Sequence, residues 1–152
     1  MLSTEQLLRL SEARDRQPET PLVARVIDAC IESAKAATVC SDACAPLANA
    51  FHLEPCVRQT RLASDLCWAS AVALLHGDAD RATLRPLLEA CRAACEASAR
   101  VCSAHAPNHE FCRVCGRACL ETVDACAKLL AAWEPDEQAD QAGATSGGER
   151  RR

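Results

Sequence analysis

Seven cysteines between residues 91 and 126 constrain the fold of this chain more than any other feature of its sequence. They are Cys91, Cys95, Cys102, Cys112, Cys115, Cys119 and Cys126. At about 100° per residue, the first three lie within roughly 40° of one another and the last four within roughly 60°, so each set forms one stripe along a helix. Between the stripes, Pro107 disfavours helix at the preceding residue and Asn108 is a good N-cap. The stretch predicts a helical hairpin with thiols on its inner face and with His105 and His109 at its turn.

Two more helices are expected before this hairpin. Thr20 and Pro21 open a helix that should end near residue 48, with its last turn loosened by Pro46. Pro55 opens the next helix, which should run to about residue 76. The cysteines of each helix again share one face: Cys30, Cys40 and Cys44 in the first, and Cys56 and Cys67 in the second.

Prolines also mark the ends of the two hairpin helices. Thr83 is the expected N-cap of the first, because choosing it over Asp80 places Pro86 in the first turn, where a missing N–H donor matters little. The second helix should start at His109 and end before Pro135. Four helices with short connections, and no segment of alternating polarity, predict an all-α fold, an antiparallel up-down-up-down four-helix bundle.

Both ends of the chain are expected to lie outside this bundle, which covers residues 20–134. Residues 1–18 contain a short N-terminal helix, in which Ser3 and Gln6 match a capping box and leucines dock on the main body. Residues 135–152 combine glycine, serine and scattered charge without apolar periodicity, which predicts a disordered tail.

Composition limits both the partners and the compartment. The formal net charge of -4 gives no basic footprint for nucleic acid, and the longest apolar runs are too short to span a membrane. Charged residues interrupt residues 1–17, so no secretory signal is expected and the protein is predicted to be cytoplasmic. In that reducing compartment the twelve cysteines should remain free thiols.

Counting along an antiparallel bundle at about 1.5 Å per residue places the cysteines in three layers. The layer nearest the histidines contains Cys44, Cys56, Cys102, Cys112 and Cys115; the middle layer contains Cys40, Cys67, Cys95 and Cys119; the deepest contains Cys30, Cys91 and Cys126. His52 is expected at the same end as His105 and His109, as an exposed loop residue, and His76 at the other end.

Twelve thiols on one internal surface favour metal binding over simple packing. Soft thiolates select Cu(I), Zn(II) or iron-sulfur clusters. Zinc and iron-sulfur sites need closed sets of four ligands, whereas a stripe on rigid helices suits Cu(I), which two nearly collinear thiolates can hold. The four-cysteine middle layer keeps open a zinc-binding protein or an iron-sulfur redox protein. A thiol-disulfide enzyme would have to use Cys112 and Cys115, which lie near a helix N-terminus.

This chain resembles the bacterial four-helix-bundle copper storage proteins in the run Cys91-x-x-x-Cys95, Cys102-x-x-His105-x-x-x-His109-x-x-Cys112-x-x-Cys115-x-x-x-Cys119, ending at Cys126. The resemblance implies that reduced cysteines hold many Cu(I) ions inside the bundle, that bundles form homotetramers, and that histidines near one end bind copper where it enters. It gives the lumen role to all twelve cysteines and the entrance role to His105 and His109. The second helix departs from the family, because Thr60, Ala63 and Leu74 occupy inward positions where thiols would fit.

The sequence therefore predicts a cytoplasmic copper store without enzymatic activity. With bridging thiolates as ligands, its capacity should be about one ion per thiol, hence about ten to twelve Cu(I) ions per chain. Its expected partners are copper ions, a copper chaperone or small thiol that delivers or accepts them, and further copies of the same chain.

Overall fold

The computed structural model describes residues 1–11, 14, 17–77 and 79–146, which form helices joined by short connections. The helices are α1 (Thr4–Leu8), α3 (Thr20–Cys44), the 3-10 helix η1 (Ala45–Leu47), α4 (Ala48–Phe51), α5 (Glu54–Leu75), α6 (Arg81–His105) and α7 (Glu110–Ser146). These described residues contain no β-strand. The all-α fold class is confirmed.

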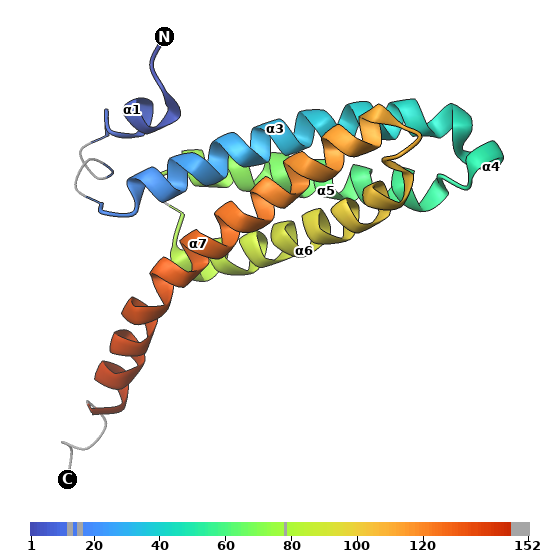
Figure 1. Cartoon of the computed structure of the whole chain (residues 1–152). Helices are drawn as coiled ribbons and strands as arrows, with labels where there is room; N and C mark the ends of the chain where they lie inside the picture. Colours follow the sequence, from blue (N-terminus) through green and yellow to red (C-terminus); the bar gives the residue numbers. More distant parts are fainter. Residues whose placement is uncertain (12–13, 15–16, 78, 147–152) are drawn as a thin grey trace.

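The four long helices form one bundle, shown in Figure 1. α3 packs against α5 and α7, and α6 packs against the same two helices, so α3 and α6 lie diagonally opposite each other. Consecutive long helices are neighbours joined by short connections, which is the arrangement of an antiparallel up-down-up-down bundle. Each long helix therefore turns one face toward a common interior.

The connection between α3 and α5 follows from Pro46. α3 ends at Cys44, earlier than residue 48, and continues into the 3-10 turn of η1, so the expected loosening of the last turn is confirmed. The short helix α4 then ends at Phe51, and its C-cap, His52, has a φ of 54°, in the left-handed region. The backbone N–H of Leu53 donates to the carbonyl of Ala48 at 3.0 Å, which reverses the chain and directs it into α5.

The start of α6 differs from the expected one. Asp80, and not Thr83, is the N-cap, because its Oδ1 accepts a hydrogen bond of 2.7 Å from the backbone N–H of Thr83. The hydroxyl of Thr83 donates to the other carboxylate oxygen at 3.3 Å. Pro86 therefore lies inside the helix. The two hydrogen bonds that the Asp80 carboxylate accepts stabilise this helix start by more than the loss of the one backbone hydrogen bond that Pro86 cannot donate.

The last helix continues past the expected end. α7 runs to Ser146, so the prediction that the helix ends before Pro135 is wrong. Beyond the bundle, α7 projects away from the other helices (Figure 1). Residues 136–146 include three alanines, two glutamines and one glutamate, which favour helix, and water can replace the one hydrogen bond that proline removes there. Residues 147–152 lie outside the described part, and for them disorder stays a prediction.

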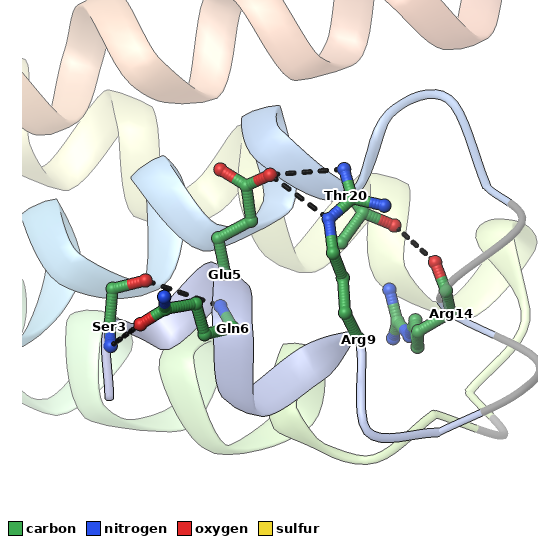
Figure 2. Close-up of polar contacts among 6 residues, drawn as sticks. All are labelled: Ser3, Glu5, Gln6, Arg9, Arg14 and Thr20. Atoms are coloured by element: carbon green, nitrogen blue, oxygen red, sulfur yellow. Dashed lines mark hydrogen bonds and ion pairs between the residues drawn. The ribbon is translucent and has the colours of Figure 1, made fainter. Parts of the chain in front are cut away.

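The N-terminal helix is short and packs against α3. Figure 2 shows its capping box, in which the N–H of Ser3 donates to Gln6 at 2.8 Å and the N–H of Gln6 donates to the Ser3 hydroxyl at 3.2 Å. Glu5 and Arg9 form an ion pair of 3.0 Å. The helix ends at Leu8, which is buried, so it is shorter than the amphipathic helix expected within residues 1–18. Residues 12–13 and 15–16 of that stretch lie outside the described part.

Large apolar side chains gather at the end of the bundle opposite the α6–α7 turn. We call this group the apolar plug: Val23, Ile27, Leu74, Leu88 and Leu129, each at most 1% exposed. Val23 and Ile27 lie near the start of α3, while Leu74 lies near the end of α5. Between the plug and the α6–α7 turn, the buried residues are mainly cysteine, alanine, serine and threonine. The interior is thus closed by apolar packing at one end.

Asp80→Ala should lower the free energy of unfolding by about 0.5–2 kcal/mol, because it removes the N-cap of α6. Urea unfolding of the reduced, metal-free protein measures this loss. Asp80→Asn is the matched control and should unfold nearly like the parent protein, since asparagine caps helices about as well. Equal losses in both variants would show that the carboxylate charge, and not the cap, stabilises this turn.

Candidate metal centre

All twelve cysteines are free thiols, and each side chain is completely buried. They come from all four long helices and face the common interior. The helical period therefore located every thiol correctly on an inward face. The same period identified Thr60, Ala63 and Leu74 as inward, and each of these is also fully buried.

Six of these thiols form a cluster at the histidine end of the bundle, which we call the upper cluster. Its members are Cys40, Cys44, Cys56, Cys102, Cys112 and Cys115. Cys40 is central, with its Sγ 3.9 Å from that of Cys56 and 4.0 Å from that of Cys102. The sulfur atoms of Cys44 and Cys56 are 3.6 Å apart. Cys40 belongs to two groups of thiols in which all sulfur atoms lie within 4.8 Å of one another, one with Cys44, Cys56 and Cys112 and one with Cys102 and Cys115.

Five thiols form a second cluster nearer the apolar plug, the lower cluster, which contains Cys30, Cys67, Cys91, Cys95 and Cys126. The Sγ of Cys67 is 3.4 Å from that of Cys95 and 3.7 Å from that of Cys91. Cys30 lies 3.9 Å from Cys91, and Cys126 interacts with both. Cys119 joins the two clusters through its interactions with Cys115 and Cys95. A continuous chain of sulfur atoms therefore runs along the interior.

The predicted middle layer of Cys40, Cys67, Cys95 and Cys119 is wrong, because Cys40 belongs to the upper cluster and Cys67 to the lower one. The cause is the early end of α3. At about 1.5 Å per residue, Cys40 lies only about 6 Å from the end of α3, while Cys67 lies about 20 Å from the start of α5. The sequence count assumed a longer first helix and so placed Cys40 too deep.

The thiols of the upper cluster share protons unevenly. Burial is the largest influence that raises the pKa of Cys112, to about 11. Hydrogen bonds from Cys102 and then Cys40 lower the pKa of Cys56 to about 3, since they stabilise its thiolate. Hydrogen bonding to Cys102 likewise lowers the pKa of Cys115. The cluster therefore combines protonated donors with thiolate acceptors, and a soft metal ion would replace the protons between them.

Three of the four histidines and both phenylalanines of the chain lie at the upper end. The ring of His109 stacks on that of Phe111 at 5.1 Å and meets the ring of Phe51 edge-on at 5.6 Å. The backbone N–H of His109 donates to the carbonyl of His105 at 3.0 Å, so both half-buried histidines belong to the α6–α7 turn. Neither belongs to a described group of three or more metal-ligating atoms. His52 is exposed in the connection after α4, as expected.

His76 is exposed at the C-terminal end of α5, near the apolar plug. His76 therefore lies at the opposite end of the bundle from His105 and His109, as expected, and is too far from the upper cluster to share their role.

Sequence reasoning overlooked the small hydroxyl side chains among the thiols. The Ser98 hydroxyl lies 4.0 Å from the sulfur of Cys115, and the hydroxyls of Ser33 and Thr122 are 2.8 Å apart. All three residues are fully buried. Ser98 is three residues after Cys95 and four before Cys102, so the helical period that located the cysteines could have found it.

Comparison with known proteins assigns the chain to a family. Residues 19–131 match the family model described as Csp, copper storage protein. The chain belongs to the copper storage protein family. One curated relative of this chain is the uncharacterized cysteine-rich protein YhjQ of Bacillus subtilis, 30% identical over 105 residues, which are 69% of this chain and 93% of that protein.

Two solved copper storage protein structures resemble the bundle closely. The copper storage protein Ccsp from Streptomyces lividans loaded with 10 copper equivalents has a TM-score of 0.79 and 36% identity, over 84% of this chain and 98% of that one. A structure of copper loading to a cytosolic copper storage protein from Streptomyces lividans, with five coppers, has a TM-score of 0.69 and 38% identity. It covers 73% of this chain and 93% of that one. The four-helix-bundle architecture is therefore shared with copper-loaded members of the family.

No described helix of this copper storage protein family member combines the length and the apolar character that crossing a bilayer requires.

Copper uptake should release protons, and affinity should fall as the pH falls. Thiols with a raised pKa, such as Cys112 at about 11, are protonated near pH 7, and Cu(I) binds the thiolate. An anaerobic titration in weakly buffered solution with a pH-indicator dye measures the release, which we expect to stay below one proton per ion, because Cys56, with a pKa of about 3, has no proton to release. Uptake of copper without acidification would contradict this account of the thiols.

Proposed function

We propose that this chain stores many Cu(I) ions by binding them to the thiolates of its twelve buried cysteines. The observation that carries the proposal is the chain of interacting thiols in a fully buried interior. Neighbouring sulfur atoms lie 3.4–4.0 Å apart within the upper cluster and among Cys30, Cys67, Cys91 and Cys95, and Cys119 interacts with both clusters. Bridging thiolates let neighbouring Cu(I) ions share ligands at such separations. The Streptomyces relatives loaded with five and ten coppers support a cargo of several ions per chain.

Charge balance supports a singly charged cargo. A Cu(I) ion that replaces one thiol proton leaves the charge of the interior unchanged. A Zn(II) ion held by four thiolates leaves an excess charge of about -2, which is costly to bury without nearby cations. Among the described residues that are buried, Arg14 is the one cation, and it lies at the plug end, remote from the upper cluster. A zinc-binding or iron-sulfur protein would need a site of four thiols. Since the predicted middle layer is wrong, that site would be the group formed by Cys40, Cys44, Cys56 and Cys112.

The burial of the thiols supports storage over thiol-disulfide catalysis. A catalytic cysteine must be accessible and readily ionised. Cys112 and Cys115, the two candidates from the sequence, are completely buried. The pKa of Cys112 is raised, and Cys115, whose pKa hydrogen bonding to Cys102 lowers, is still inaccessible to a substrate. The shell of helices would instead keep water and oxygen away from reduced copper.

The upper end of the bundle is the proposed entrance for copper, since the apolar plug closes the other end. His105 and His109 are the proposed first ligands there. Phe51 and Phe111 hold the ring of His109 between them, which limits its freedom and fixes it near the mouth. From there an ion would pass to the upper cluster and then, through Cys119, to the lower cluster.

The finer expectations about location and assembly are also part of the proposal. A cytoplasmic location would keep the thiols reduced, and a relative is described as cytosolic. Self-association into a tetramer is supported by the exposed side chains of Leu62, Trp68 and Val72 on the outer face of α5. α1 packs on α3, so it leaves this face available. A copper chaperone or a small thiol would deliver and remove the ions.

An anaerobic titration of the reduced protein with Cu(I), in competition with a chromogenic chelator, tests the storage function. Tight uptake of about ten to twelve ions per chain is expected, on the basis of one ion per bridging thiolate. Metal content measured independently provides the control. Saturation at about one or two ions, or displacement by zinc, would show instead a single site such as the four-thiol group of the upper cluster.

Replacing both His105 and His109 with alanine should slow Cu(I) uptake and leave the final capacity unchanged, because the thiols hold the stored ions. Stopped-flow transfer from the chelator measures the rate, and the titration measures the capacity. His76→Ala is the matched control at the opposite end and should load at the parental rate. Equal slowing in both variants would contradict an entrance at the α6–α7 turn.

A further inference from the structure

Arg14 is a buried cation without a carboxylate partner among the described residues. It is 6% exposed, and its Nη2 donates to the carbonyls of Leu74 at 3.0 Å and His76 at 3.3 Å, which caps the C-terminal end of α5. Figure 2 shows its carbonyl accepting from the Thr20 hydroxyl, and the guanidinium apart from the Glu5–Arg9 ion pair. A guanidinium keeps its charge in proteins, and buried charges are normally paired. Its partners within the described part of the chain are neutral carbonyls.

Two buried hydrogen-bond donors without acceptors belong to residues that line the same hollow. The Nε of Arg14 and the indole Nε1 of Trp133 are both buried and have no acceptor. Trp133 belongs to α7 and is 3% exposed, while Arg14 belongs to the segment before α3. Both residues line one hollow of about 80 Å³, together with Gly77 and Arg81. A single water needs about 10–15 Å³ measured in this way, so the hollow has room for a larger acceptor.

The charges around the hollow favour an anion. Arg81 stacks over the ring of Trp133 at 5.5 Å and forms an ion pair with Glu19, the carboxylate that lines the hollow. Among the described residues, Glu19 is the carboxylate that lines the hollow, and it pairs with Arg81, so the charge of Arg14 has no described counter-charge. Buried donors left without acceptors are costly. A group with a negative charge and several acceptor oxygens would accept from both N–H groups and would also neutralise Arg14.

We propose that this hollow at the plug end binds a small oxyanion, which accepts hydrogen bonds from Arg14 Nε and Trp133 Nε1. The shared chemistry is that of inorganic phosphate, sulfate or a small carboxylate. Bound there, the anion joins the N-terminal segment, the α5–α6 connection and α7 at the closed end of the bundle. The site is remote from the thiols, so it goes beyond copper storage and does not depend on it.

The chain contains two tryptophans, which makes the test internally controlled. Trp68 is 43% exposed on α5 and does not line the hollow. In proton–nitrogen NMR spectra of the reduced, metal-free protein, titration with inorganic phosphate should shift the indole resonance of Trp133 saturably and leave that of Trp68 in place. Parallel titrations with sulfate and acetate, at matched ionic strength, identify which oxyanion the hollow prefers.

Arg14→Met should abolish the saturable shift of Trp133, while Arg9→Met, which removes a half-buried arginine of the same segment that does not line the hollow, should keep it. If Arg14→Met does not fold, the titration of the parent protein decides alone. Phosphate should also raise the melting temperature of the parent protein, and the rise should keep growing with the logarithm of the phosphate concentration, as expected for a ligand that binds the native state. An unmoved Trp133 resonance, or equal and linear shifts of both tryptophans, would overturn the proposal and leave water as the occupant.

Discussion

Close packing of sulfur around a common axis is the constraint on which the rest of this structure depends. Neighbouring sulfur atoms lie 3.4–4.0 Å apart over most of the bundle, so the helices must carry small residues between them. Such a core contains few large apolar side chains. The large ones are instead concentrated in the apolar plug, where Ile27, Leu74 and Leu88 are fully buried. Stability and metal chemistry are thereby assigned to different parts of one interior.

The faces of the helices could be predicted from the sequence, because burial follows the helical period. Every cysteine predicted to point inward does so, as do Thr60 and Ala63 in the helix that has the fewest thiols. Depth along the bundle could not be predicted equally well, because it depends on where each helix ends. The 3-10 turn at Pro46 shortens α3 and raises Cys40 into the upper cluster.

Local competition between hydrogen bonds explains the other differences. Asp80, and not Thr83, is the N-cap because its carboxylate accepts from both the backbone N–H and the hydroxyl of Thr83. A prediction based on the position of Pro86 alone does not take this advantage into account. The pairing of Ser33 with Thr122 joins residues 89 positions apart, which no local pattern reveals. Arg14 is a comparable case, since its partners are carbonyls at the far end of another helix.

The apolar plug makes the interior a tube that is blind at one end. With copper entering at the proposed upper end, the cargo would be ordered by depth: ions held by Cys30 and Cys126 would leave only past Cys119 and the upper cluster. The last ions to arrive would then be the first to depart. Such an interior would combine a shallow fraction for rapid exchange with a deep fraction held as a long-term reserve.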